Sequence, residues 1–218
     1  MLSTIICRHV RSEGLDKGIA EGREGVLTDR GREQAVALAH DLARYSISRI
    51  YVGTYVRHRQ TLDTLLAMRA IPVIETPMLD EIHQGLLTGE KKARVRSLQR
   101  SSGQNFGQWR PSGGETRQEA QRRIVTYYTA ILEESPSGCL LFLSSAGVIS
   151  GLLAHLLRRP LAARTYAELH PSPGAYSMFS IDAARHHTLR VLNTTAHLRR
   201  KESFRTPDAS LPRQLMSL

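Results

Sequence analysis

Short apolar runs alternate along the chain with longer segments in which apolar residues recur every three or four positions. The runs at 5–7, 47–52 and 139–143 are too brief for helices and are typical of buried strands. The periodic segments at 29–44 and 117–134 are typical of amphipathic helices. Strands that alternate with helices in this way predict an α/β fold, a three-layer sandwich with a largely parallel central sheet and helices on both faces.

Weaker patterns complete the prediction. Helices are expected at 55–68 and 148–157, a short strand at 72–75, and the last strands at 175–181 and 189–192. The inward-facing helix residues are predicted to be Ala35, Leu38, Ala39, Leu42, Leu62, Leu65, Leu66, Ala120, Ile124, Tyr127 and Ile131.

Two helix starts carry their own signals. Thr28 is predicted to cap the helix at 29–44, because its side-chain oxygen can accept from a free backbone N–H group. Thr116 and Glu119 have the spacing of a capping box for the helix at 117–134.

The chain has no internal repeat and no linker, so residues 1–198 are predicted to form a single domain. Residues 10–27 are rich in glycine and charge and are expected to be a surface loop. Residues 85–111 carry many basic side chains and form an insertion, either a solvated face or a lid over a site. Residues 199–218 are expected to be a basic polar tail.

Composition places the chain among ordinary globular proteins, with 41% hydrophobic and 23% charged residues in a length of 218. No apolar run is long enough to span a bilayer, and the start lacks the order of a signal peptide, so a cytoplasmic protein is expected. Cys7 and Cys139 lie in strand-like runs and are expected to be buried thiols rather than a disulfide, a metal site or a nucleophile.

The charge balance is basic, with 30 Lys and Arg against 20 Asp and Glu and a formal net charge of +10. Such a balance favours anionic partners. Because the sequence has no basic stripe interleaved with aromatic residues and no zinc spacing, nucleic acid is not the expected partner.

The first strand ends in Arg8 and His9, at the edge of the sheet where ligands bind in open α/β folds. Further polar motifs follow in order at 27–35 (LTDRGREQA), 57–61 (RHRQT), 79–82 (LDEI), 113–116 (GGET), 143–149 (LSSAGVI) and 192–198 (LNTTAHL). In their order and spacing these motifs resemble the histidine phosphatase superfamily, the phosphoglycerate-mutase-like proteins. The resemblance covers residues 4–198.

The resemblance implies a mechanism. His9 would attack a phosphorus atom and become phosphohistidine, Arg8 and Arg57 would hold the phosphoryl oxygens, and Glu81 would protonate the leaving oxygen. Ser12, Ser145 and Ala146 are the further residues expected to contact the substrate, a small phosphorylated or otherwise anionic molecule. No metal or organic cofactor is implied.

The residue types suit this chemistry. A neutral imidazole is a good nucleophile near neutral pH, and a guanidinium offers paired planar donors to phosphate oxygens. A carboxyl group in a partly dry pocket can stay protonated and act as a general acid.

The sequence also departs from the family's pattern. Ser145 stands where the resemblance places a second histidine, and Val10 and Ala146 stand where it places glycines. Val10 would then add bulk where a phosphate approaches the backbone. Losing one preorganised donor costs about 10²–10³ in rate, so Ser145→His is expected to raise activity. Ser145 itself is interpreted as an N-cap of the following helix.

Three hypotheses stay open. The chain is an enzyme that transfers or hydrolyses a phosphoryl group through His9, weakened or redirected by Ser145; or it binds an anion without turnover; or it uses His9 and Glu81 as acid and base in other chemistry. His58 and His83 flank the motifs and are interpreted as structural or solvent-facing. The oligomeric state, including a homodimer, is left open.

Overall fold

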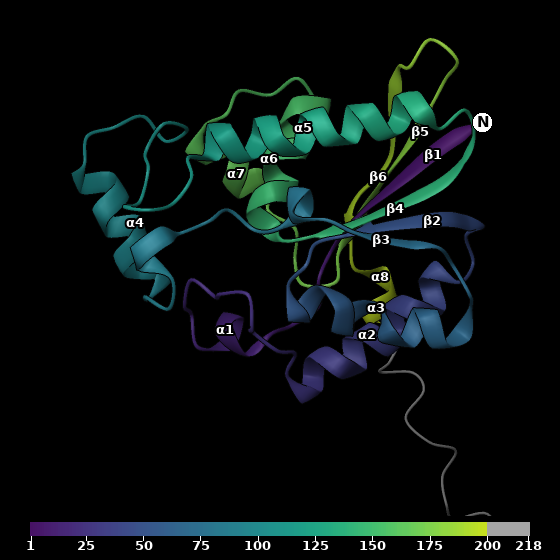
Figure 1. The fold of residues 1–218 in the computed structure, drawn as a ribbon, viewed down its shortest axis with the longest axis horizontal. Helices are drawn as coiled ribbons and strands as arrows, with labels where there is room; N and C mark the ends of the chain where they lie inside the picture. Colours follow the sequence, from purple (N-terminus) through teal and green to yellow (C-terminus); the bar gives the residue numbers. More distant parts are fainter. Residues whose placement is uncertain (200–218) are drawn as a thin grey trace, which may run out of the picture.

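The computed structural model describes residues 1–199 (Figure 1), so the tail predicted at 199–218 lies outside the described residues except for Arg199. Six strands form one sheet in the order β3-β2-β4-β1-β5-β6. The strands are β1 (Leu2–Arg8), β2 (Ile47–Val52), β3 (Val73–Glu75), β4 (Gly138–Ser144), β5 (Tyr176–Ile181) and β6 (His187–Thr194). Strands β3, β2, β4 and β1 are parallel and β5 is antiparallel to both its neighbours, so the largely parallel sheet is confirmed.

Helices cover both faces of the sheet, as predicted. In Figure 1, α2, α3 and α8 lie on one face and α5, α6 and α7 on the other, while α4 stands apart beyond the sheet. The helices are α1 (Glu13–Asp16), α2 (Asp29–Leu42), α3 (Val56–Met68), α4 (Lys92–Ser101), α5 (Arg117–Glu134), α6 (Ala146–Leu156), α7 (Ala163–Glu168) and α8 (Ala196–Arg199), with short 3₁₀ turns η1 (Pro77–Leu79) and η2 (Gly85–Leu87).

Successive residues of the central strands point to opposite faces of the sheet and pack in two separate hydrophobic cores. In β1, Ile6 packs with α5 and α6, whereas Ile5 and Cys7 pack with α2 and α3. In β4, Phe142 belongs to the first core and Leu141 to the second. A strand buried on both faces explains why these runs are continuously apolar. Both cysteines are free and buried, as predicted.

The predicted caps are present. The Thr28 hydroxyl accepts from the Gly31 N–H at 3.0 Å, and Thr116 with Glu119 forms the capping box of α5. In α5, Ala120 and Ile124 are buried as predicted, but in the second half of the helix Tyr128 is buried and Tyr127 only half-buried. The Tyr128 hydroxyl shares a hydrogen bond with Thr4 of β1 at 2.9 Å, which satisfies this buried polar group.

Residues 10–27 form the predicted loop, interrupted by the short helix α1, but the loop is not wholly at the surface. Val10, Ser12 and Leu27 are buried. Backbone hydrogen bonds tie this segment to the basic insertion, from Ala20 N to Glu90 O and from Lys92 N to Gly18 O, both at 2.8 Å. The hydrophobic pattern and the composition of a segment do not show which distant segment it pairs with. Here that pairing determines where residues 10–27 lie.

We call residues 85–111 the roof, because they stand over the carboxyl ends of the strands. Its apolar contacts are few: Ala20, Val95 and Trp109 form a small buried cluster separate from the two cores. Within residues 1–199, every helix is too short or too polar to span a membrane.

Candidate active site

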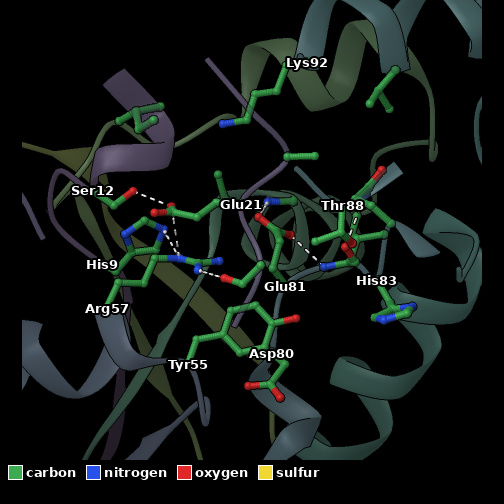
Figure 2. A pocket seen from close by; sticks show the side chains of 18 of the residues that line it. His9, Ser12, Glu21, Tyr55, Arg57, Asp80, Glu81, His83, Thr88 and Lys92 are labelled. Carbon is green, nitrogen blue, oxygen red and sulfur yellow. Dashed lines mark hydrogen bonds and ion pairs between the residues drawn. The ribbon is translucent and has the colours of Figure 1, made fainter. Parts of the chain in front are cut away.

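A cavity of about 730 Å³ opens where β1 ends, and it brings the predicted catalytic residues together. Arg8 and His9 come from the end of β1, Arg57 from the first turn of α3, and Glu81 from the chain after η1. All four line the cavity, and Figure 2 shows His9, Arg57 and Glu81 along one wall. We call the ends of β1 and β4 with the first turns of α3 and α6 the floor of the site.

His9 is held in one tautomer by two hydrogen bonds. Its Nδ1 lies 2.7 Å from the Val10 carbonyl oxygen, and its Nε2 lies 3.3 Å from Arg57 Nε, which has a hydrogen to donate. Nδ1 therefore carries the ring proton, and Nε2 carries the lone pair. Burial, with the nearby charges of Arg8 and Arg57, holds the pKa of His9 well below its usual value. His9 is 3% exposed, and a neutral imidazole of this kind can act as a nucleophile.

Arg57 is fixed from several sides. Its Nη1 donates to the Gly22 carbonyl at 2.7 Å, and its guanidinium stacks on the Tyr55 ring with 4.6 Å from Cζ to the ring centre. Glu21 faces it, with 3.7 Å between Glu21 Oε2 and Arg57 Nε. A buried guanidinium with only one close carboxylate can offer its remaining donors to an anion in the cavity.

Arg8 is also buried. Its Nη1 donates to the Pro171 carbonyl at 2.7 Å, and its Nε has no hydrogen-bond partner within the described residues. Burial lowers the pKa of Arg8 to about 10, against the raising effect of Glu81. Arg8 is therefore charged at neutral pH, and it lines the cavity.

Glu81 lies in the chain after η1, and its side chain contacts the first turn of α6. Its Oε1 accepts from the Ile82 N–H at 2.9 Å and its Oε2 from the Gly147 N–H at 3.2 Å. Two backbone bonds fix the carboxyl group in the cavity wall, at a position from which it can exchange a proton with a leaving oxygen.

The three residues expected to contact the substrate lie in different places. Ser12 and Ala146 line the cavity. Ser145 occupies the N-cap position of α6 but makes no capping hydrogen bond, so the cap interpretation is wrong. The Ser145 hydroxyl lies instead 2.8 Å from His58 Nε2, and both residues are 0% exposed.

One further expectation is corrected. Val10 does not crowd the cavity, because its side chain is buried in the core shared with α2 and α3. His58 is fully buried beside the site, with its ring centre 5.5 Å from that of His9, and His83 is exposed at the rim, which agrees with the structural and solvent-facing positions expected for these residues.

Several residues of the cavity wall were not predicted from the sequence. Glu21 accepts from Ser12 Oγ at 2.6 Å and from the Gly14 N–H at 2.9 Å, in a segment taken for a surface loop. The roof supplies Lys92 from α4, which Figure 2 shows reaching over the cavity. The remaining unpredicted wall residues include Tyr55, Arg96, Phe106, Arg117, Tyr166 and His170. For Lys92 and Arg96, the excess of basic residues at 85–111 was the sequence signal that pointed to this wall.

The donor set does not suit a metal ion. Within residues 1–199, no group of three histidine, cysteine, aspartate or glutamate side chains is arranged to hold one. The cavity wall carries six Arg and Lys side chains against three Asp and Glu side chains, a balance that suits an anion.

Comparison with known proteins agrees with this geometry. The adenosylcobalamin/alpha-ribazole phosphatase of Escherichia coli strain K12 is 27% identical over 199 residues, covering 88% of this chain and 95% of that protein. A 2,3-bisphosphoglycerate-dependent phosphoglycerate mutase of Cytophaga hutchinsonii is 29% identical over 163 residues, 70% of this chain and 76% of that one.

Among solved structures, that of Bacillus stearothermophilus YhfR superposes with a TM-score of 0.82 over 91% of this chain and 100% of that one, at 20% identity. This similarity supports the fold alone. The family model of the histidine phosphatase superfamily (branch 1) matches residues 4–195. The chain therefore belongs to the histidine phosphatase superfamily.

Proposed function

We propose that this protein hydrolyses a phosphomonoester of a small molecule through a phosphohistidine formed on His9. The observation that carries the proposal is the pair of hydrogen bonds that leaves His9 Nε2 unprotonated, with its lone pair accepting from Arg57 Nε–H until a phosphoryl group takes up that donor, in a cavity with two arginines. Family membership and the phosphatase names of the relatives support the same reaction class.

In the first step His9 Nε2 forms a bond to phosphorus while the bond from phosphorus to the leaving oxygen breaks. Arg8 and Arg57 stabilise the charge on the phosphoryl oxygens, where most of the catalytic effect of such sites arises. A proton from Glu81 goes to the leaving alcohol.

In the second step water attacks the phosphohistidine. Glu81, now a carboxylate, takes a proton from that water as the new oxygen–phosphorus bond forms and the nitrogen–phosphorus bond breaks. His9 returns to its neutral form and inorganic phosphate leaves, so the residues end the cycle as they began.

The roof and the adjoining residues of α5 and α7 indicate the rest of the substrate. Lys92 and Arg96 of the roof and Arg117 of α5 add positive charge away from His9. Phe106 of the roof and Tyr166 of α7 pack edge to face with ring centres 5.2 Å apart. We propose a substrate that carries a second anionic or strongly polar group, larger than a bare phosphate. The alpha-ribazole phosphate and phosphoglycerate named for the relatives are the first compounds to assay.

A second candidate is an anion-binding protein without turnover. The specific observation in its favour is Ser145, which we propose stands where relatives carry a second histidine and which is buried rather than lining the cavity. The redirected acid–base reaction of His9 and Glu81 would use the same cavity but form no phosphoenzyme.

A panel of phosphomonoesters with wild type and His9→Asn separates these candidates. We expect wild type to release phosphate, to form an acid-labile phosphoenzyme, and to lose at least ~10⁴-fold activity in the variant. Sulfate binding without phosphate release favours the second candidate, and turnover without any phosphoenzyme favours the redirected reaction. Glu24→Gln, an exposed change in the loop at 10–27, serves as the matched control.

A further inference from the structure

His58 and Ser145 form a buried pair directly behind the floor of the site. His58 lies in the first turn of α3, next to Arg57, and Ser145 immediately precedes α6. The imidazole Nε2 and the hydroxyl oxygen are 2.8 Å apart, and the pair links the helix that carries Arg57 to the helix whose Ala146 and Gly147 line the cavity.

The surroundings of His58 hold its ring from both sides. The ring stacks on Tyr55 with centres 5.4 Å apart, and the Gly53 backbone lies against Nδ1 and interacts with it as a hydrogen-bond partner. A ring proton on Nδ1, facing that backbone, leaves Nε2 to accept from the Ser145 hydroxyl.

The charge on His58 decides what Ser145 can do. A neutral imidazole that accepts at Nε2 takes the only hydroxyl hydrogen of Ser145. A protonated ring donates from Nε2 to the hydroxyl oxygen instead and frees that hydrogen. Burial and Arg57 hold the pKa of His58 well below its usual value, so the pair is uncharged near neutral pH.

The charged and titratable groups that face His58 are His9 from the end of β1, Arg57 from α3, and Tyr55 before it. Ser145 is the contact from α6 and does not titrate. Burial is the larger cause of the neutral state, and a dianion bound by the floor would offset the second cause, the charge of Arg57.

We propose that His58 is a positioning residue that acts through Ser145: it takes up a proton from solvent when a phosphoryl dianion binds to the floor, and the imidazolium then reorients the Ser145 hydroxyl and the start of α6 toward that charge. The inference rests on the proposed function for its substrate, but its first test needs no turnover.

Calorimetric titration with inorganic sulfate, in two buffers of different ionisation enthalpy at the same near-neutral pH, measures the protons taken up on binding. We expect wild type to take up close to one proton more per sulfate than His58→Gln, which keeps a donor near Ser145 but cannot ionise. Any uptake by His9 is common to both proteins. His40→Gln, at an exposed position on α2, is the matched control and should behave as wild type.

Equal proton uptake in wild type and His58→Gln overturns the inference, as does a wild type that binds no sulfate. A wild type that shows the difference but hydrolyses no phosphomonoester overturns the proposed function and leaves this inference standing. The two failures are therefore distinguishable.

A double-mutant cycle tests whether the pair acts as one unit. His58→Ala and Ser145→Ala are each expected to lower kcat by about 10- to 100-fold, and the double variant by no more than the larger single effect. Losses that multiply overturn the inference. Thermal unfolding of each variant identifies any that fails to fold. If an alanine variant does not fold, the calorimetric comparison of wild type with His58→Gln tests the inference instead.

The buried pair also changes what Ser145→His should do. A second imidazole at this position would have to share a fully buried space with His58, so the single change is expected to lower both activity and Tm. His58→Ala combined with Ser145→His moves the imidazole across the pair and should return kcat to within about tenfold of wild type. A gain from Ser145→His alone, with His58 retained, contradicts the coupling.

Discussion

The floor and the roof of the cavity are built in opposite ways. The floor stands on the ends of buried strands, between two cores that run the length of the sheet. The roof rests on the small cluster of Ala20, Val95 and Trp109, on backbone bonds to the loop at 10–27 and on the contact of Phe106 with the first core. A region with few buried apolar contacts opens locally at low free-energy cost. Under the proposed function, the floor would therefore carry the chemistry and the roof would bind the rest of the substrate.

The largest expected effects come from exchanging single cations in the two regions. Arg57→Lys keeps the charge but cannot donate both to His9 and to Gly22, so we expect kcat/KM to fall by about 10²–10³. Lys92→Met in the roof should instead raise KM by about tenfold and leave kcat within about threefold, because it removes binding without touching the nucleophile. Steady-state kinetics decide, and equal losses of kcat in both variants would refute the division of roles.

Two valines, one under the floor and one in the roof, test whether the two regions differ in their contribution to stability. Val52 in β2 is 1% exposed within a large core, and Val95 in α4 is 7% exposed within the small cluster. Val52→Ala should lower the free energy of unfolding by about 2 kcal/mol, and Val95→Ala by less than ~1 kcal/mol.

Chemical denaturation measures the two losses. Hydrogen exchange should show that Val95→Ala speeds exchange in residues 85–111 alone, while Val52→Ala speeds it across the sheet. Equal global losses would mean that the roof folds as part of the main core.

The smallest expected effect concerns Glu21, which contacts both the roof side and the floor of the cavity. Glu21 belongs to the loop that supports the roof, yet its carboxylate lies 3.7 Å from Arg57 on the floor and competes with an anion there. Glu21→Gln should tighten sulfate binding about fivefold, equivalent to ~1 kcal/mol. Calorimetry compares it with Glu24→Gln on the same loop, which should bind as wild type. Weaker binding by Glu21→Gln would show that the bonds to Ser12 and Gly14 matter more than the charge.

The sequence by itself determined the layered α/β fold and the meeting of four site residues. Apolar periodicity identifies strands and helices because each element must bury one face or two. The carboxyl ends of parallel strands share one edge, so Arg8 and His9 could be placed there from the first strand alone. The order of the motifs added Arg57 and Glu81.

Tertiary structure decided the rest. Glu21 and Lys92 enter the cavity through pairing between segments about 70 residues apart, and neither residue carries a local signal of that pairing. The contact between His58 and Ser145 joins two helices 87 positions apart in the chain, and it turned an expected cap into half of a buried pair. Helix and strand periods report which face of an element is buried, but which side chains then meet depends on how the elements pack.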